Sequence, residues 1–498
     1  ICRMKKIILF LISIFCLHTN AVAQIDTSAN TIVSHTISGT ILDENNTPLP
    51  YVNIVSLNSG KGTISNENGN FLIDIYYLND TNIIRFQCIG YKTKDYKIES
   101  LKSNSIILLS ENIYSLDEVI ILGTIPNPEK IVKSILQNKD LNYKNITKKA
   151  QVFIRERTTS EILKLRLGYN KNNIKEVTPE TLSYVEKNIP KNNQSYSDVL
   201  TNIYFKENNI KIKPIKAVEL KKEVDKELKN IAANFKKLFN NTKENEFWRI
   251  KTGIIGKKLK AAENDSLKDR ALNTKSSTRY KERIEGFLEF ATFKNKEHWE
   301  FLHKINKYKY EVIGGTSINN EKVYIIDFLP KEQGRYQGRL YISIETSALI
   351  RADYKYAPNK EEENKAFGFA FSDLNFSGSI YFDNKNNNYN LRYLSYKENK
   401  RIGIKRKFAL QKKKKRLLLN KKLSEIKIDL DILIDNKESI ELLIVDHSKI
   451  SNIEFDNVIE KKYIDVTYVN QFDKSLWKNY TTIEPTQQMK EYKKLDEN

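Results

Sequence analysis

The sequence has 498 residues, of which 83 are Lys or Arg and 62 are Asp or Glu, so the formal net charge is +21. Apolar residues make up 40% and charged residues 29%, a balance that is typical of globular domains and excludes a polytopic membrane protein or a collagen. Three cysteines are too few for a disulfide scaffold, and a length of this size predicts about two to four domains.

The N-terminal segment has the three parts of a secretory signal peptide. Met4, Lys5 and Lys6 precede an apolar run over residues 7–17, and Ala21, Val22 and Ala23 supply the small-x-small pattern of a cleavage site. The apolar run is too short to cross a hydrocarbon core of ~30 Å. We therefore expect a signal peptide at residues 1–23 and an exported protein, in the periplasm or associated with the outer membrane. Cleavage would leave Cys88 as the last cysteine, without an intramolecular partner.

Short alternating runs separated by turn residues follow between residues 35 and 112. The runs lie at residues 37–42, 51–55, 71–75, 83–88 and 106–109. Asn68 and Gly69 form a dipeptide that favours a tight hairpin, since both residues accept positive φ. Spacing of this kind predicts an antiparallel β-sandwich of about seven short strands.

Four blocks of this segment resemble the carboxypeptidase regulatory-like domain, a transthyretin-like sandwich found beside metallocarboxypeptidases and at the N-terminus of outer-membrane nutrient receptors. The blocks are SGTILD (38–43), PLPYVNI (48–54), GTISNENGNFLI (62–73) and IRFQCIGY (84–91). The resemblance implies a fold and a Gram-negative envelope setting, and no reaction. A linker similar to LDEVIILG (116–123) precedes a plug and barrel in the receptors, but residues 124–498 are too few for a plug and a 22-stranded barrel.

Residues 113–145 are predicted to be a linker that contains a short helix. Asn127 is suited to cap this helix and Pro128 to occupy its first position. The apolar residues that would share one helix face are Ile131, Val132, Ile135 and Leu136.

Residues 146–498 are predicted to form a larger α+β domain on an antiparallel sheet that could curve into a half-barrel, so the whole chain is expected to be mainly β with some α. A strand is expected at residues 151–157, and a helix at residues 218–239 from the spacing of its apolar residues, packed on the sheet or lying on a membrane surface. Six strands joined by short turns are expected at residues 308–312, 322–328, 339–344, 350–356, 376–382 and 391–396. Residues 426–434 alternate most strictly, with isoleucine and leucine on one side and charge on the other.

A second resemblance concerns VYIIDFLP (323–330) and YQGRLYISIETSALI (336–350), which are similar to a stretch of secreted envelope proteins that carry the same sandwich. The layout of those proteins is similar to that of lipoprotein-carrier half-barrels, whose concave sheet holds an acyl chain. The resemblance implies that the apolar side of the strands lines such a surface. A small integral outer-membrane barrel is an alternative, although the charged strand positions and the polar C-terminus count against it.

Signals for catalysis are missing from the sequence. The four histidines after the signal segment, at positions 35, 298, 303 and 447, form no H-E-x-x-H, and neither helix nor strand geometry brings His298 and His303 to one metal. There is no G-x-S-x-G, Walker or dinucleotide motif, and residues 314–317 look like a loop between strands. We therefore expect no enzyme, cofactor or metal, with a hydrolase that uses an unrecognised carboxylate site as the alternative.

Positive charge is concentrated in residues 400–427, where thirteen Lys and Arg stand against one acidic residue. The pattern predicts two strands whose shared turn, near residues 412–415, is a basic tip. The candidate residues for binding an anionic surface are Lys405, Arg406, Lys407, Lys412, Lys413, Lys414, Lys415 and Arg416. The predicted partner is anionic lipid, lipopolysaccharide or an outer-membrane protein, and not nucleic acid; a solvated sheet edge without a partner is the alternative. The predicted function is a non-enzymatic envelope protein for binding or assembly that holds a hydrophobic ligand or a partner protein.

Overall fold

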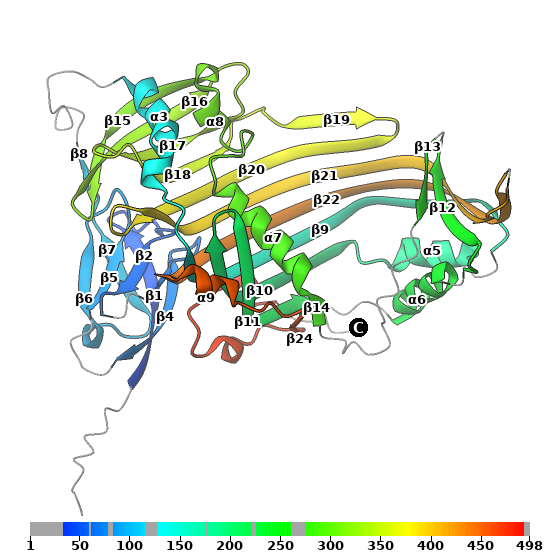
Figure 1. Ribbon diagram of the computed structural model, residues 1–498, viewed down its shortest axis with the longest axis horizontal. Coiled ribbons are helices and arrows are strands. Elements are labelled where there is room, and N and C mark those ends of the chain that lie inside the picture. The colour runs from blue at the N-terminus through cyan, green and yellow to red at the C-terminus, as the bar shows by residue number, and fades with distance from the viewer. Residues whose placement is uncertain are drawn as a thin grey trace, which may run out of the picture.

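The structure is a computed structural model that describes residues 33–58, 61–77, 83–114, 127–174, 177–221, 226–240, 242–253, 255–259, 274–417 and 419–492 (Figure 1). The expected signal peptide at residues 1–23 and the linker-like stretch 116–123 lie outside these ranges. Within them the chain is mainly β with some α, as predicted: a small N-terminal sandwich stands beside one large sheet.

The N-terminal sandwich contains two sheets, β4-β1-β7 and β3-β2-β5-β6. Its strands are β1 (Val33–Asp43), β2 (Asn53–Ser56), β3 (Gly62–Ile64), β4 (Asn70–Tyr77), β5 (Ile83–Gln87), β6 (Lys94–Lys97) and β7 (Ser105–Leu109). Apolar side chains at alternate positions, among them Ile37, Ile41 and Phe86, fill the space between the sheets. The sandwich is not wholly antiparallel, because β1 pairs with β7 in parallel.

The large sheet runs in the order β24-β11-β10-β9-β22-β21-β20-β18-β17-β16-β15-β8, with β12, β13 and β19 attached at its side. The first half of this path consists of β24 (Thr467–Val469), β11 (Asn209–Lys221), β10 (Asn192–Lys206), β9 (Lys148–Asn172), β22 (Lys421–Lys449) and β21 (Tyr389–Lys414). The second half consists of β20 (Phe369–Asn384), β18 (Leu349–Tyr356), β17 (Tyr336–Ser343), β16 (Glu321–Pro330), β15 (Tyr308–Ile318) and β8 (Ile113–Tyr114). The attached strands are β12 (Glu246–Thr252), β13 (Ile255–Leu259) and β19 (Glu362–Ala366).

The other described elements are α-helices, two short strands and the 3₁₀ helices Ile98–Ser100, Ile305–Lys307 and Lys474–Trp477. The α-helices are α3 (Pro128–Gln137), α4 (Lys139–Asn142), α5 (Pro179–Asn188), α6 (Lys226–Asn240), α7 (Ser277–Phe290), α8 (Glu300–His303), α9 (Asn452–Asp456) and α10 (Gln487–Lys490), and β14 (Thr274–Ser276) pairs with β23 (Tyr463–Asp465). Asn127 caps α3 as predicted, since its side chain accepts a hydrogen bond from the Lys130 amide at 3.1 Å.

Two local predictions were wrong. The helix expected at residues 218–239 begins only at Lys226, because Val218 and Leu220 lie in β11 and pair with β10. The loop expected at residues 314–317 is part of β15, which contains a bulge between Val312 and Gly314. A Cβ at Gly314 would lie 2.7 Å from the Tyr114 carbonyl oxygen, so glycine there serves the close approach of β8 and not a turn.

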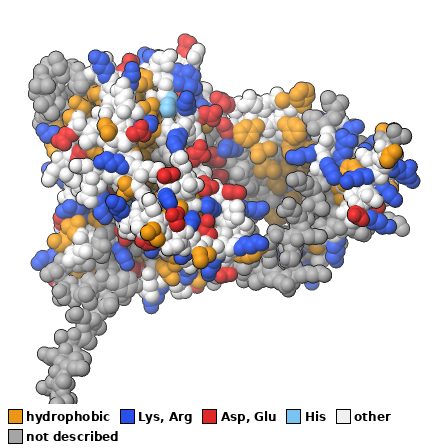
Figure 2. All heavy atoms as spheres, viewed as in Figure 1, with side chains coloured by type: hydrophobic (Ala, Val, Ile, Leu, Met, Phe, Trp, Pro, Cys, Tyr) orange, Lys and Arg blue, Asp and Glu red, His pale blue; other side chains and the backbone are white. Residues whose placement is uncertain are grey.

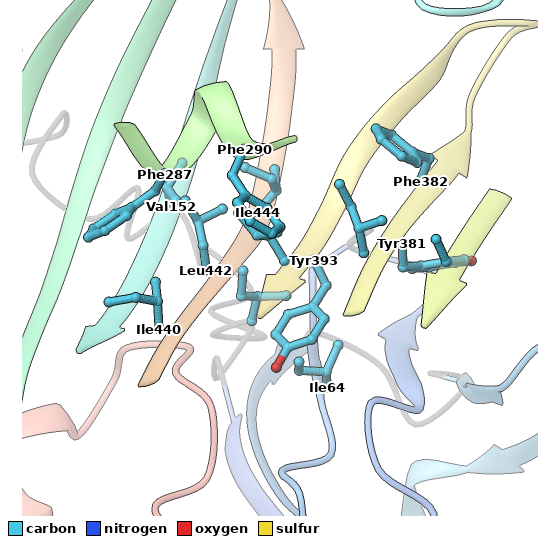
Figure 3. Close-up of a cluster of buried hydrophobic side chains, with 14 of the residues drawn as sticks. Ile64, Val152, Phe287, Phe290, Tyr381, Phe382, Tyr393, Ile440, Leu442 and Ile444 are labelled. Atoms are coloured by element: carbon cyan, nitrogen blue, oxygen red, sulfur yellow. The ribbon is translucent and has the colours of Figure 1, made fainter. Parts of the chain in front are cut away.

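The two faces of the large sheet pack against different parts of the chain. One face, here called the helix face, lies under α3, α7 and α8, and the aromatic rings of Phe290 and Tyr396 stack there with centroids 5.0 Å apart. The other, the domain face, meets the N-terminal sandwich. Figure 3 shows Phe287 and Phe290 of α7 on one side, and Ile64 of the sandwich near Tyr393 on the other.

Specific polar contacts attach the sandwich to the sheet. The buried Arg392 of β21 donates to the Asn53 side chain at 3.0 Å and to the Val445 carbonyl oxygen at 3.2 Å. Thr63 donates to the carbonyl oxygen of Thr482, in the C-terminal segment, at 2.8 Å. Because these buried hydrogen bonds join the sandwich to β21 and to the C-terminal segment, we infer that the sandwich and the sheet form a fixed unit.

A buried ion pair joins β9 to β10 on the domain face. Arg155 contacts Asp198 with two hydrogen bonds of 2.9 and 2.7 Å, and the two side chains are only 6% and 2% exposed. Arg155 also donates to the Ile483 carbonyl oxygen at 2.9 Å, which holds the C-terminal segment against the sheet. Asp198 is therefore the carboxylate in direct contact with the buried Arg155, and Glu441 and Glu484 add further negative charge around it.

We predict that Asp198→Ala lowers the free energy of unfolding by about 3–5 kcal/mol, because Arg155 would remain buried without its partner. Denaturant unfolding followed by circular dichroism measures this change. The control is Asp140→Ala, which removes an ion pair whose acidic side chain is 90% exposed and should leave the midpoint unchanged. Equal midpoints for both variants would contradict the assigned role of the pair.

Candidate functional site

Four neighbouring strands, β20, β21, β22 and β9, continue well past α7 and form a long extension of the sheet (Figure 1). On the helix face of this extension the side chains are almost all apolar. The group defined here as the distal apolar face consists of Ile162, Leu165, Phe369, Phe371, Ile402, Ile404, Phe408, Leu430, Ile432 and Ile434.

The pairing of the strands fixes the membership of this face. Ile404 lies opposite Ile432, and Ile432 lies opposite Leu165, so aliphatic side chains form a continuous row across three strands. Phe369, Phe371 and Ile402 are 40–41% exposed, and the other members are half-buried. Exposed apolar area of this kind is uncommon on a monomer and marks an interaction surface.

Covering elements border the distal apolar face at both ends. Toward the body of the molecule α7 covers the sheet, and at the far end Leu182, Trp248 and Ile426 form a separate small core under α5 and β12. Figure 2 shows hydrophobic side chains gathered in a hollow between these two ends. Residues 260–273, which connect β13 to β14, lie outside the described residues and contain only two leucines and three alanines as apolar residues.

The domain face of the same extension carries charge. Arg401 contacts Asp435 through bonds of 2.6 and 2.8 Å, and Lys407 lies 3.9 Å from Asp429. Asp431 contacts Lys164, which lowers the pKa of that carboxyl group. The prediction that residues 426–434 separate apolar from charged positions is confirmed by the register, although the apolar side is only partly buried.

The eight predicted basic residues do not form one surface. Alternation along β21 places Lys405, Lys407 and Lys413 on the domain face, whereas Arg406 and Lys412 lie on the helix face. β21 extends to Lys414 and β22 begins at Lys421, so Lys415 and Arg416, and not Lys412 to Lys414, lie between the two strands. Lys412 is already paired with Glu246 at 2.8 Å, and this bond lowers the pKa of the Glu246 carboxyl group.

Arg406 is the basic residue that the structure brings to the distal apolar face. Its guanidinium carbon lies 5.0 Å from the centroid of the Phe369 ring, a cation–π distance. Its Nη1 atom is buried and has no hydrogen-bond partner among the described residues. The Thr252 hydroxyl of β12 is also buried and has no partner among these residues. A Cβ on Gly253 would lie 3.1 Å from the Arg406 Nη2 atom, so the end of β12 approaches this guanidinium closely. The sequence analysis grouped Arg406 with Lys405 and Lys407. Strand alternation is the sequence signal that could have placed Arg406 on the opposite face of the sheet.

His298 and His303 both pack against neighbouring residues of the protein. The His303 Nε2 atom lies 2.7 Å from the Phe293 carbonyl oxygen, and the His298 ring packs 4.3 Å from the Phe290 ring centroid. Burial lowers the pKa of His298. Across the described residues no group of three His, Cys, Asp or Glu side chains could hold a metal ion. No described helix has the length and apolarity needed to span a membrane.

Comparisons with known proteins address the N-terminal sandwich. The family model described as CarboxypepD_reg-like domain matches residues 37–121. Residues 37–121 are a carboxypeptidase regulatory-like domain. A curated relative, TonB-dependent receptor P39 of Formosa agariphila, is 30% identical over 87 residues, which are 18% of this chain and 8% of the relative. These matches support such a domain in an envelope protein, while the chain spans less than a tenth of the relative that it matches.

Among solved structures, MucB in complex with MucA(peri) is 5% identical, covering 68% of this chain and 100% of that chain with a TM-score of 0.17. The Pseudomonas aeruginosa MucA/MucB complex is 7% identical, covering 68% of this chain and 99% of that chain with a TM-score of 0.18. The predicted half-barrel layout therefore stays a prediction.

We predict that the native protein enhances the fluorescence of a hydrophobic dye such as anilinonaphthalene sulfonate, because the distal apolar face offers exposed apolar area. The double variant Phe371→Glu/Ile402→Glu should lower the enhancement by roughly half or more. The control is Ile106→Glu on β7, where an isoleucine that is 68% exposed lies far from this face. Unchanged fluorescence in the double variant would contradict an accessible distal apolar face.

Proposed function

We propose that this envelope protein binds an anionic amphiphile, whose hydrocarbon chain lies on the distal apolar face and whose head contacts Arg406. The observation that carries the proposal is the position of an unpartnered guanidinium nitrogen at the border of an exposed apolar sheet face. A ligand with one apolar and one anionic part satisfies both features at once.

The hydrocarbon part gains free energy from burial. Removing each CH₂ group from water contributes about 0.8 kcal/mol, and the rings of Phe369 and Phe371 lose exposed area at the same time. The strand backbones underneath are already paired within the sheet, so an apolar chain adds no buried polar group that lacks a partner. This favours a flexible hydrocarbon over a peptide, which would bring its own backbone.

The anionic head group of the ligand would accept hydrogen bonds from donors that have no partner among the described residues. The Arg406 guanidinium suits a carboxylate or a phosphate, since its planar donors can form two parallel bonds. The Thr252 hydroxyl is a second donor without a described partner. Burial strengthens such charge-assisted bonds, and cation–π contact with Phe369 keeps the guanidinium at the border of the apolar face.

The basic tip has a different role in the proposal. Lys414, Lys415 and Arg416 are exposed and project at the far end of the extension. Each cation near an anionic membrane surface contributes about 1 kcal/mol of attraction at moderate salt. The tip would bring the protein to anionic lipid, and the distal apolar face would take up the chain.

We predict that Arg406→Gln weakens binding of a fluorescent fatty acid about tenfold, because it removes a charge-assisted bond to the carboxylate. Fluorescence titration at constant ionic strength measures the dissociation constant. The control variant is Lys407→Gln, which changes the adjacent residue on the opposite face, where the lysine side chain is 78% exposed. The corresponding fluorescent fatty alcohol should bind wild type and Arg406→Gln equally. Equal fatty acid affinity in both variants would refute the proposed head site.

We also predict that replacing Lys414, Lys415 and Arg416 by Gln reduces cosedimentation with vesicles that contain anionic phosphatidylglycerol, since three attractive contacts are lost. Binding of the soluble fatty acid should not change, because these residues lie outside the distal apolar face. Vesicles of neutral phosphatidylcholine serve as the control. Membrane association that persists in high salt and in the variant would contradict an electrostatic role of the tip.

A further inference from the structure

A polar groove lies on the domain face, between the sheet and the N-terminal sandwich, with a cavity volume of about 590 Å³. This is within the range of ~300–1,000 Å³ that is typical of small-ligand sites. It is separate from the distal apolar face, which lies on the opposite side of the sheet. We call it the interdomain groove.

One row of directly paired residues crosses the floor of the interdomain groove from β15 to β21. In strand order the row is Glu311, Asp327, Arg339, Asp353, Ser379 and Ser395. Arg339 contacts Asp327 through bonds of 2.6 and 2.9 Å, and the Ser379 hydroxyl donates to Asp353 at 2.6 Å. These bonds hold the polar groups of the row in fixed positions.

A second row runs parallel to the first and consists of Gln337, Lys355, Ser377 and Lys397. The side chains of Gln337, Lys355 and Ser377 make no hydrogen bond or ion pair with any described residue, and neither does the side chain of Glu311 of the first row. The groove therefore offers a carboxylate, an ammonium, an amide and a hydroxyl group that are free to bind a ligand.

The sandwich supplies one wall of the groove. Tyr51 lines the groove and packs on Tyr393 of the sheet, with ring centroids 4.9 Å apart. Its φ of +62° is in the left-handed region, which is uncommon for a bulky residue and tends to occur at functional positions. Glu67 of the sandwich pairs with Lys397, so the groove is complete only when the sandwich is docked.

We propose that the interdomain groove binds a saccharide. A sugar ring presents many hydroxyl groups that both donate and accept, which matches a floor of alternating acidic, basic and hydroxyl side chains. Its less polar C–H face can pack on the Tyr51 ring. Glu311, Asp327 and Asp353 balance Arg339, Lys355 and Lys397, so the groove has no net charge that would select a strongly anionic or cationic ligand.

Other ligand classes fit less well. Leu329 is the one aliphatic side chain of the lining besides the aromatic residues. An acyl chain would leave the polar side chains of the floor without hydrogen-bond partners. A peptide that adds a strand needs an unpaired sheet edge, whereas the central floor strands β16, β17, β18 and β20 are paired on both sides.

The test is a glycan array probed with the labelled full-length protein, followed by calorimetric titration with the oligosaccharide that gives the strongest signal. We expect Ser377→Trp, which fills the floor, to weaken binding about tenfold or more, and Glu311→Gln to weaken it by a smaller factor. Ser100→Trp, at an exposed position of the sandwich, should bind like wild type. Unchanged melting temperatures would confirm that the variants fold.

The absence of signal on the array, or equal affinity of wild type and Ser377→Trp, would overturn the proposal. A free glycan and the sugar headgroup of a glycolipid share this chemistry, so the titration is repeated with the same sugar on a lipid. Equal affinities assign the free sugar as the ligand, and higher affinity for the lipid form that is still lost in Ser377→Trp assigns the glycolipid headgroup.

Discussion

The alternation of side chains along three strands of 25, 26 and 29 residues, β9, β21 and β22, is the constraint on which the rest of the molecule depends. Successive residues point to opposite faces, so a shift of one residue would move every apolar side chain to the charged side. A bulge at Leu163 preserves the separation of apolar and charged side chains along β9. One extra residue in β9 leaves Lys164 and Arg166 with the charged face, and returns Leu165 and Leu167 to the apolar face.

Because one face of the sheet is apolar and the other is polar, different parts of the chain pack on each face. The aromatic residues of α7 and α8 cover the apolar face near the body of the molecule. The sandwich attaches to the opposite face through Arg392, and to the C-terminal segment through Thr63. Attachment on that side leaves the distal apolar face without a cover from the sandwich. The same arrangement encloses a polar groove, so the proposed lipid and sugar sites lie on opposite faces of one sheet.

Patterns within one segment were read correctly from the sequence. The family match confirms the carboxypeptidase regulatory-like domain, and the strand positions of the meander and the cap at Asn127 agree with the structure. Errors arose where a distant segment decides the conformation. Leu220 fits a helical stripe, but pairing with β10 makes it part of a strand, and Gly314 resembles a loop residue, but β8 needs its missing side chain.

The sequence by itself determined the sandwich, the amphipathic strands and the concentration of positive charge in residues 400–427. Each of these features follows from a pattern of residues that are close together in the chain. Tertiary structure decided which of those charges act together. Strand alternation turned Arg406 toward the distal apolar face, next to Phe369. Strand register brought Glu311, Lys355 and Ser377, far apart in the chain, into one groove with Tyr51. Contacts between distant strands depend on pairing and docking across the whole sheet, which no local pattern specifies.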